Sequence, residues 1–204
     1  MRAGAAAGGF VVLALAWGGA PVFLATFPFT AHMTTHMALV AVAAPLLAIA
    51  VAGTRLDPVT LRPGLFAPIP ASMVELMAVW GWHAPAPHQA ASAWLGAYVA
   101  EQTTFLAAGL LLWLAVLGGR LGERRARRTA GAGALLFTSI HMTLLGALFA
   151  LATRPFYGRH GGHAHDLTDL HLGGAVMLLI GGASYLAGGL AVLVPTLGTA
   201  TRRA

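Results

Sequence analysis

The sequence predicts an all-α fold, a polytopic membrane helix bundle of about six transmembrane helices. Of the 204 residues, 58% are hydrophobic and only 9% are charged, whereas soluble domains carry about 25% charged residues. Several runs of about twenty residues contain almost no charge, and each could cross a hydrocarbon core of about 30 Å as a helix. We therefore expect residues 1–204 to form one transmembrane domain.

Apolar runs, separated by Pro, Gly and Arg residues, mark the six expected helices. Their ranges are about 8–28, 31–52, 69–84, 93–118, 130–153 and 167–194. A signal peptide cut after Ala20 is the alternative for the first run. Pro21 would then follow the cut, and the apolar stretch continues to Phe27, beyond the usual length of a signal core. We expect an uncleaved first helix.

The arginines predict the orientation of the bundle. The chain has a net charge of +6, and its arginines concentrate in the N-terminus, the 53–68 linker, the 119–129 loop and the C-terminus. Since cytoplasmic segments of membrane proteins are rich in Arg and Lys, both termini should be cytoplasmic. We therefore expect the positive charge to contact lipid headgroups rather than a nucleic acid. The arginines on this side are Arg2, Arg55, Arg62, Arg120, Arg124, Arg125, Arg127, Arg128, Arg202 and Arg203, against Arg154 and Arg159 on the other.

All nine histidines fall at or above mid-bilayer on the side away from these arginines. His32 and His36 open the second helix at its outer end, and His141 lies near the middle of the fifth. The pattern predicts a polar vestibule that opens outward, with His141 at its floor. The remaining histidines are His83, His88, His160, His163, His165 and His171. We expect the three between 159 and 166 to lie in a solvated loop.

Two acidic residues belong to the same region. Glu101 is about eight residues into the fourth helix, so about 12 Å deep, and Asp169 stands near the start of the sixth. Ionisable groups at membrane depth are costly and usually face the bundle interior. Glu75, by contrast, is near the cytoplasmic end of the third helix, where its side chain can reach the headgroups.

The local pattern His32-Met33-Thr34-Thr35-His36-Met37 indicates a metal site. On a helix, positions i and i+4 share one face about 6 Å apart, so His32 and His36 can hold one ion. Imidazole and thioether without thiolate suit copper, Cu(I) in particular, and the chain has no cysteine. Zinc also fits the imidazoles and carboxylates. Packing is the competing explanation for Met33, Met37 and Met142.

Four stretches together resemble the CtaG family of bacterial cytochrome c oxidase assembly factors, the multi-spanning membrane type. They are His32-Met33 with His36-Met37 and Ala44-Pro45; Trp82-His83 with Pro85; Glu101 with Phe105 and Gly109 to Trp113; and Asp169 to Gly174 with Met177. The sequence departs from the family pattern at Gln102, at Leu170-His171 and at Leu178. Relative to the family pattern, these departures would remove a ligand at position 102 and supply one at position 171.

The resemblance implies a role in maturing a haem–copper oxidase, with copper supplied on the periplasmic side of the bacterial inner membrane. Cytochrome c oxidase subunits and periplasmic copper carriers would be the partners. The expected ligands are His32, His36, His83, His171 and His141, with Met33, Met37 and Met142 as auxiliary ligands. Glu101 and Asp169 would orient imidazoles or compensate charge.

Two other functions stay open at this point, and neither is an enzyme. A haem protein would need axial histidines on facing helices, for which His36 with His171, or His141 with either, would serve. A transporter would use His141 and Glu101 as a proton or ion pathway. No His-Glu-x-x-His pattern of a metal hydrolase is present, and we expect no catalytic activity.

Overall fold

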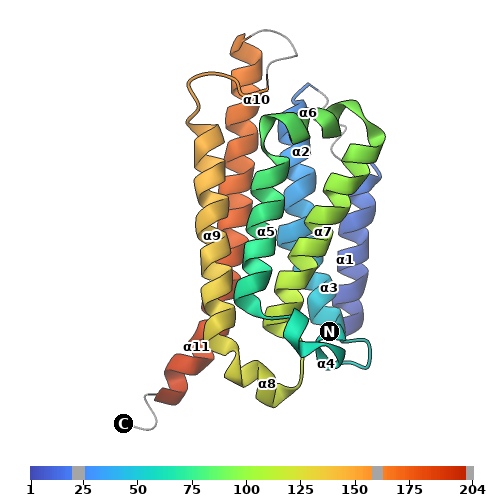
Figure 1. Cartoon of the computed structure of the whole chain (residues 1–204), viewed down its shortest axis with the longest axis vertical. Coiled ribbons are helices and arrows are strands. Elements are labelled where there is room, and N and C mark those ends of the chain that lie inside the picture. Colours follow the sequence, from blue (N-terminus) through green and yellow to red (C-terminus); the bar gives the residue numbers. More distant parts are fainter. Residues whose placement is uncertain (20–25, 158–162, 201–204) are drawn as a thin grey trace.

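Long helices run along one axis of the molecule (Figure 1). The computed structural model describes residues 1–19, 26–157 and 163–200, and these contain helices and no strand. The long helices are α1 (Arg2–Trp17), α2 (Pro28–Met37), α3 (Ala44–Val51), α5 (Pro68–Trp82), α7 (Leu95–Leu117), α9 (Arg128–Ala150), α10 (His163–Val176) and α11 (Gly182–Ala200). Short elements are α4 (Pro58–Leu61), η3 (Pro63–Leu65), α6 (Pro85–Ala93) and α8 (Leu121–Ala126).

Two π-helical turns join shorter helices into continuous rods. The turn η2 (Ala38–Ala43) links α2 to α3, and η4 (Met177–Gly181) links α10 to α11. A π-turn bonds each N–H to the carbonyl five residues earlier and often marks a functional region. The two turns lie beside each other in the bundle.

Four segments are long and apolar enough to cross a membrane: Pro28–Val51, Leu95–Leu117, Arg128–Ala150 and Asp166–Val194. These segments support the predicted membrane protein. The other two rods, α1 with 16 residues and α5 with 15, measure about 24 and 22 Å at 1.5 Å per residue. A six-span topology therefore stays a prediction.

The first helix differs from its expected range of 8–28. It begins at Arg2 and ends at Trp17, where Gly18 follows and Gly19 adopts a φ of 94°. A positive φ is accessible to glycine at little cost and ends the helical path. The later part of the expected range includes residues 20–25, which lie outside the described residues. The second helix begins at Pro28, since proline fits the first turn of a helix.

Helix α6 occupies a stretch expected to be a break. Pro85 and Pro87 suggested a linker, but both stand in the first turn of α6. The N–H groups of a first turn have no partner within the helix, so proline loses nothing there. The element matters because it carries His88.

Arginines and histidines gather at opposite ends of the bundle. The start of α1 and the end of α11 lie at the end that holds α4 and α8, while α6 and the start of α10 lie at the other (Figure 1). At this arginine end, Arg2 Nη2 donates to the Ala52 carbonyl at 3.1 Å and Arg127 Nη1 to the Phe66 carbonyl at 2.9 Å. These arginines therefore satisfy backbone carbonyls at the ends of α3 and of the α4–α5 connection. Which end faces the cytoplasm stays a prediction.

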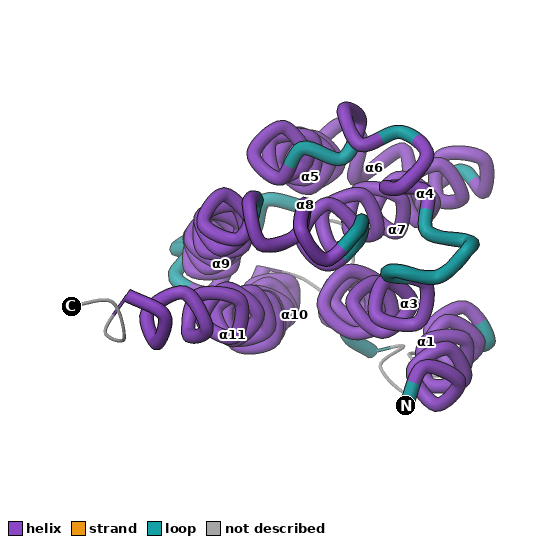
Figure 2. The backbone as a smooth tube through the Cα atoms, turned by 90° about the horizontal axis from the view of Figure 1, so that it is seen from below, coloured by secondary structure: helices purple, strands orange, loops and turns teal. Residues whose placement is uncertain are grey.

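Helix packing leaves α1 at the periphery and encloses the polar residues. Seen along the axis, α1 lies at one edge beside α3, and α5 lies near the opposite edge (Figure 2). Helix α5 packs on α7 and α9, and α9 packs on α10 and α11. Close approach of α9 to α10 depends on glycine: a Cβ at Gly174 would be 2.4 Å from Ala150 N. Small residues serve this purpose in membrane bundles.

Candidate metal centre

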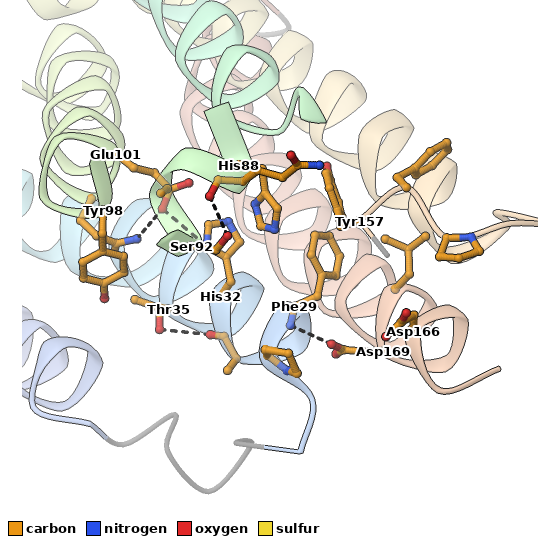
Figure 3. Close-up of a pocket in the computed structure, with 18 of the residues that line it drawn as sticks. Phe29, His32, Thr35, His88, Ser92, Tyr98, Glu101, Tyr157, Asp166 and Asp169 are labelled. Carbon is orange, nitrogen blue, oxygen red and sulfur yellow. Dashed lines mark hydrogen bonds and ion pairs between the residues drawn. The ribbon is translucent and has the colours of Figure 1, made fainter. Parts of the chain in front are cut away.

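A cavity of about 480 Å³ lies at the histidine end of the bundle. Figure 3 shows His32, His88 and Glu101 lining it from α2, α6 and α7, with Tyr157 from the α9–α10 connection nearby. Helix α2 and the consecutive helices α6 and α7, far from it in the sequence, thus bring metal-binding side chains to one place. Other residues that line it are Trp17, Phe29, Tyr98, Gln102 and Asp169.

The donor atoms of His32, His88 and Glu101 converge. One donor atom from each residue lies within 4.8 Å of those of the other two, and His32 Nδ1 is 3.6 Å from Glu101 Oε2. His32 Nε2, His88 Nδ1 and Glu101 Oε1 are buried and have no hydrogen-bond partner. Buried polar atoms are nearly always paired in native proteins. Two imidazoles and a carboxylate with unused donors are therefore suited to a cation.

Two more imidazoles continue the cluster inward. The ring centroid of His83 is 5.4 Å from that of His32 and 5.2 Å from that of His36. His83 Nδ1 is 2.6 Å from the Val79 carbonyl, and because a carbonyl only accepts, this nitrogen carries the proton. His83 Nε2 therefore has a free lone pair. Both nitrogens of the fully buried His36 are also unpaired. We call His32, His36, His83 and His88 the histidine cluster.

Phe105 holds the inner part of the cluster. Its ring stacks on that of His36 with a centroid distance of 3.9 Å and an interplanar angle of 12°. Phe105 is one turn after Glu101 on α7, so one helix face supplies both the carboxylate and the platform. The orientation of His36 is therefore set by packing against α7.

The charge state of the outer imidazole suits ligation. Burial lowers the pKa of His88 to about 4, so at pH 7 this imidazole is neutral. Metal ligation requires the neutral form. Burial, followed by the nearby Glu101, raises the pKa of Tyr157. The Tyr157 hydroxyl keeps its proton and donates it to the His83 carbonyl at 2.5 Å, while its ring lies 4.1 Å from that of His88.

Asp169 has a role different from the one expected. Its two carboxylate oxygens accept the backbone N–H groups of Phe29 and Thr30, each at 2.8 Å. The first N–H groups of a helix lack partners within that helix, so Asp169 caps α2 from α10. Its oxygens accept these backbone N–H groups and the Thr30 hydroxyl rather than an imidazole. It positions His32 through the start of α2, without contacting the ring.

His171 and His141, two further expected ligands, do not line the cavity. His171 Nε2 donates to the Ala152 carbonyl at 2.8 Å, which ties α10 to the end of α9. His141 is buried deeper on α9 with both nitrogens unpaired, and its ring lies 5.6 Å from that of Phe137. Of the loop histidines, His160 lies outside the described residues, as do the side chains of His163 and His165.

The methionines fill space left by glycines. Met33 Cγ is 3.2 Å from where a Cβ would stand at Gly173, and Met37 Sδ is 2.9 Å from that position at Gly181. Met33, Met37 and Met142 are fully buried. This geometry favours the packing interpretation over auxiliary ligation.

His88 and Tyr157 belong to the site and were not anticipated from the sequence as part of it. The available signal for His88 was the placement of Pro85 and Pro87 in a possible first helical turn, which would have put His88 on a helix beside the cluster. No comparable signal exists for Tyr157, because its position depends on the fold of the α9–α10 connection.

Comparison with known proteins adds one match. A family model described as cytochrome c oxidase caa3 assembly factor (Caa3_CtaG) matches residues 1–197. No curated protein and no solved structure matches the chain.

Proposed function

Since this chain belongs to the family of cytochrome c oxidase caa3 assembly factors, we propose that it supplies copper to the oxidase from the histidine end of the bundle. The family assigns the chain to assembly of the oxidase, which is therefore its partner. Copper is the cargo in this proposal. The observation that carries it is the convergence of unpaired donors from His32, His88 and Glu101.

The donor set supports copper. Sites made of nitrogen and oxygen donors bind Cu²⁺ more tightly than the other divalent first-row metals, and imidazole is a good ligand for copper in general. His36 and His83 lie directly inward of His32 and add two more imidazoles. The methionines pack against glycines, so the proposal rests on imidazole and carboxylate rather than on thioether.

The cavity supports delivery rather than permanent storage. Three protein donors leave coordination positions of the ion available to a partner, and these positions face a space of about 480 Å³. A partner's ligand can enter there and exchange with His88 or Glu101. If the arginine end is cytoplasmic, the cavity faces the periplasm of the bacterial inner membrane, where copper carriers would load it.

Copper accounts for the geometry better than haem. A haem held by His36 and His171 would have to displace Phe105, which stacks on His36 at 3.9 Å, and break the bond from His171 to Ala152. Copper needs neither change. The cluster already presents free nitrogen atoms at His32, His36, His83 and His88.

Metal analysis of the detergent-purified protein tests the proposal. After loading with copper and removal of excess, the wild type should retain the ion. His32→Ala/His36→Ala should lose most of it. His171→Ala is the matched control, because that imidazole is half-buried near the same end of the bundle but bonds to Ala152. Equal copper in wild type and double variant would refute the site.

A second measurement tests delivery. Cells whose only copy of the chain is His32→Ala/His36→Ala should assemble oxidase with less copper per haem than cells with the wild type or His171→Ala. Normal copper content of the oxidase in the double variant would refute the delivery role, even if the purified wild-type protein binds copper.

A further inference from the structure

Glu75 is a buried carboxyl that the copper proposal does not use. It stands near the middle of α5 and is fully buried, so its side chain does not reach the headgroup region as the sequence suggested. Tyr185 of α11 hydrogen-bonds to Glu75 Oε1. The hydroxyl of Thr138 on α9 lies close enough to Glu75 to act on this carboxyl as a donor, although neither Glu75 Oε2 nor this hydroxyl has a hydrogen bond of good geometry. A fully buried carboxyl with these neighbours raises the question of its protonation state.

The hydrogen bonds of Tyr185 indicate the protonation state of Glu75. Its hydroxyl lies within bonding distance of two acceptors, Glu75 Oε1 and the Val40 carbonyl, the latter at 3.2 Å. A hydroxyl has a single proton to donate. If that proton goes to Val40, the contact with Glu75 is a hydrogen bond only when Glu75 itself donates. If it goes to Glu75, the hydroxyl oxygen faces the Val40 oxygen with no proton between them.

The surroundings of Glu75 also favour the neutral acid. Among the described residues, no Arg, His or amino group forms an ion pair with Glu75, and its recorded side-chain neighbours Tyr185 and Thr138 are uncharged. Burying an unpaired carboxylate is so costly that such a group takes up a proton instead. A carboxylate would moreover have only neutral hydroxyl groups, those of Tyr185 and Thr138, to offset its buried charge.

We propose that Glu75 is a proton-binding site in the interior of the bundle, occupied by a proton in the folded protein. The carboxyl O–H donates to the Tyr185 oxygen, and the Tyr185 O–H donates to the Val40 carbonyl. Val40 belongs to the π-turn η2, whose altered bonding turns this carbonyl toward side-chain donors, and Trp113 Nε1 also donates to it at 3.2 Å. One proton relay thereby joins α5, α11 and the π-turn.

The protonation state of Glu75 affects the charge near the histidine cluster, whether or not copper is bound. Val40 is four residues after His36, so the relay stands about 6 Å from it along the same rod. A neutral Glu75 contributes no negative charge below the cluster. Glu101, whose donor atom converges with those of His32 and His88, is then the carboxylate placed to offset a bound cation, whereas the Asp169 carboxylate caps α2.

Infrared spectroscopy of the metal-free, detergent-purified protein tests the inference directly. A protonated carboxyl gives a carbonyl stretch well separated from the carboxylate bands, and exchange into D2O shifts it. We expect Glu75→Gln to remove such a band, while Glu101→Gln, the matched control, leaves that band in place. Loss of a carboxylate band in Glu75→Gln, with no change among the carboxyl bands, would overturn the proposal.

Tyr185→Phe provides a second and independent measurement. It removes the acceptor of the carboxyl proton but keeps the ring, so the same band should remain and shift in frequency. An unchanged carboxyl region in Tyr185→Phe would overturn the assigned relay, including in the case where Glu75→Gln does not fold. Because no metal is present, failure here is separate from failure of the copper proposal.

Discussion

The Asp169 carboxylate accepts both the backbone N–H of Thr30 at 2.8 Å and its hydroxyl at 2.7 Å, although the two residues are 139 positions apart. This contact joins the middle of α10 to the start of α2. His32 follows Thr30 by two residues, so the cap sets where the first imidazole of the cluster stands. A residue expected to orient a ligand directly thus acts through the backbone of the helix that carries it.

Removing this cap should destabilise the protein. Asp169→Ala would leave two buried backbone N–H groups without their acceptor, whereas the Thr30 hydroxyl could still donate to the backbone carbonyl of residue 169 at 3.1 Å. Loss of an N-cap costs about 0.5–2 kcal/mol, and we expect the upper part of that range because the groups are buried. Asp169→Asn keeps one acceptor oxygen, so its melting temperature should lie between those of Asp169→Ala and the wild type. Thermal unfolding in detergent measures this, and equal melting temperatures for Asp169→Ala and the wild type would contradict the assignment.

His88→Ala should weaken copper binding. The variant removes one of three converging donors, and even loss of a group that merely supports a ligand costs about 10- to 100-fold in metal affinity. We therefore expect a loss of at least about tenfold, measured by competition with a chelator of known affinity. Gln89→Ala is the control, since Gln89 also lines the cavity beside His88 on α6 but carries neither an imidazole nor a carboxylate. Equal affinities in the two variants would exclude His88 as a ligand.

Acidification should destabilise the metal-free protein through His88. Burial lowers the pKa of His88 to about 4 in the folded state, whereas an unfolded histidine has a pKa of about 6.5. Between these values the unfolded state binds more protons, so stability rises with pH. The melting temperature should therefore fall from pH 7 to pH 5. His88→Ala should show a shallower fall, and an unchanged slope would refute this contribution.

Gly174→Ala should disturb the contact between α9 and α10. The added methyl group would stand 2.4 Å from Ala150 N and 2.7 Å from the Gly146 carbonyl, both backbone atoms. Overpacking of this kind typically costs about 1–3 kcal/mol. Gly133→Ala on α9 is the control, because nothing lies within 4 Å of its added Cβ. That variant should be neutral or more stable by about 0.5–1 kcal/mol, and equal unfolding curves for both would contradict the close approach.

Local features of the chain were predictable where they depend on nearby residues. The helical class, the membrane character and the family are confirmed. The shared face of His32 and His36 follows from helical spacing, and the structure places the third expected ligand, His83, beside them. The end of α1 at Gly18–Gly19 and the helix at Pro85 differ from expectation. Glycine with a positive φ ends a helix, and proline is compatible with a helix in its first turn, so the effect of each residue depends on its position.

By itself, the sequence determined that this chain is an apolar helical protein with arginines and histidines at opposite ends. Hydropathy and charge along the chain carry that information, since they act on each segment separately. The tertiary structure alone decided that His88 joins His32 and Glu101, that Asp169 caps α2, and that Glu75 meets Tyr185. These contacts depend on how each helix is rotated and packed, and residues far apart in the chain set that rotation together.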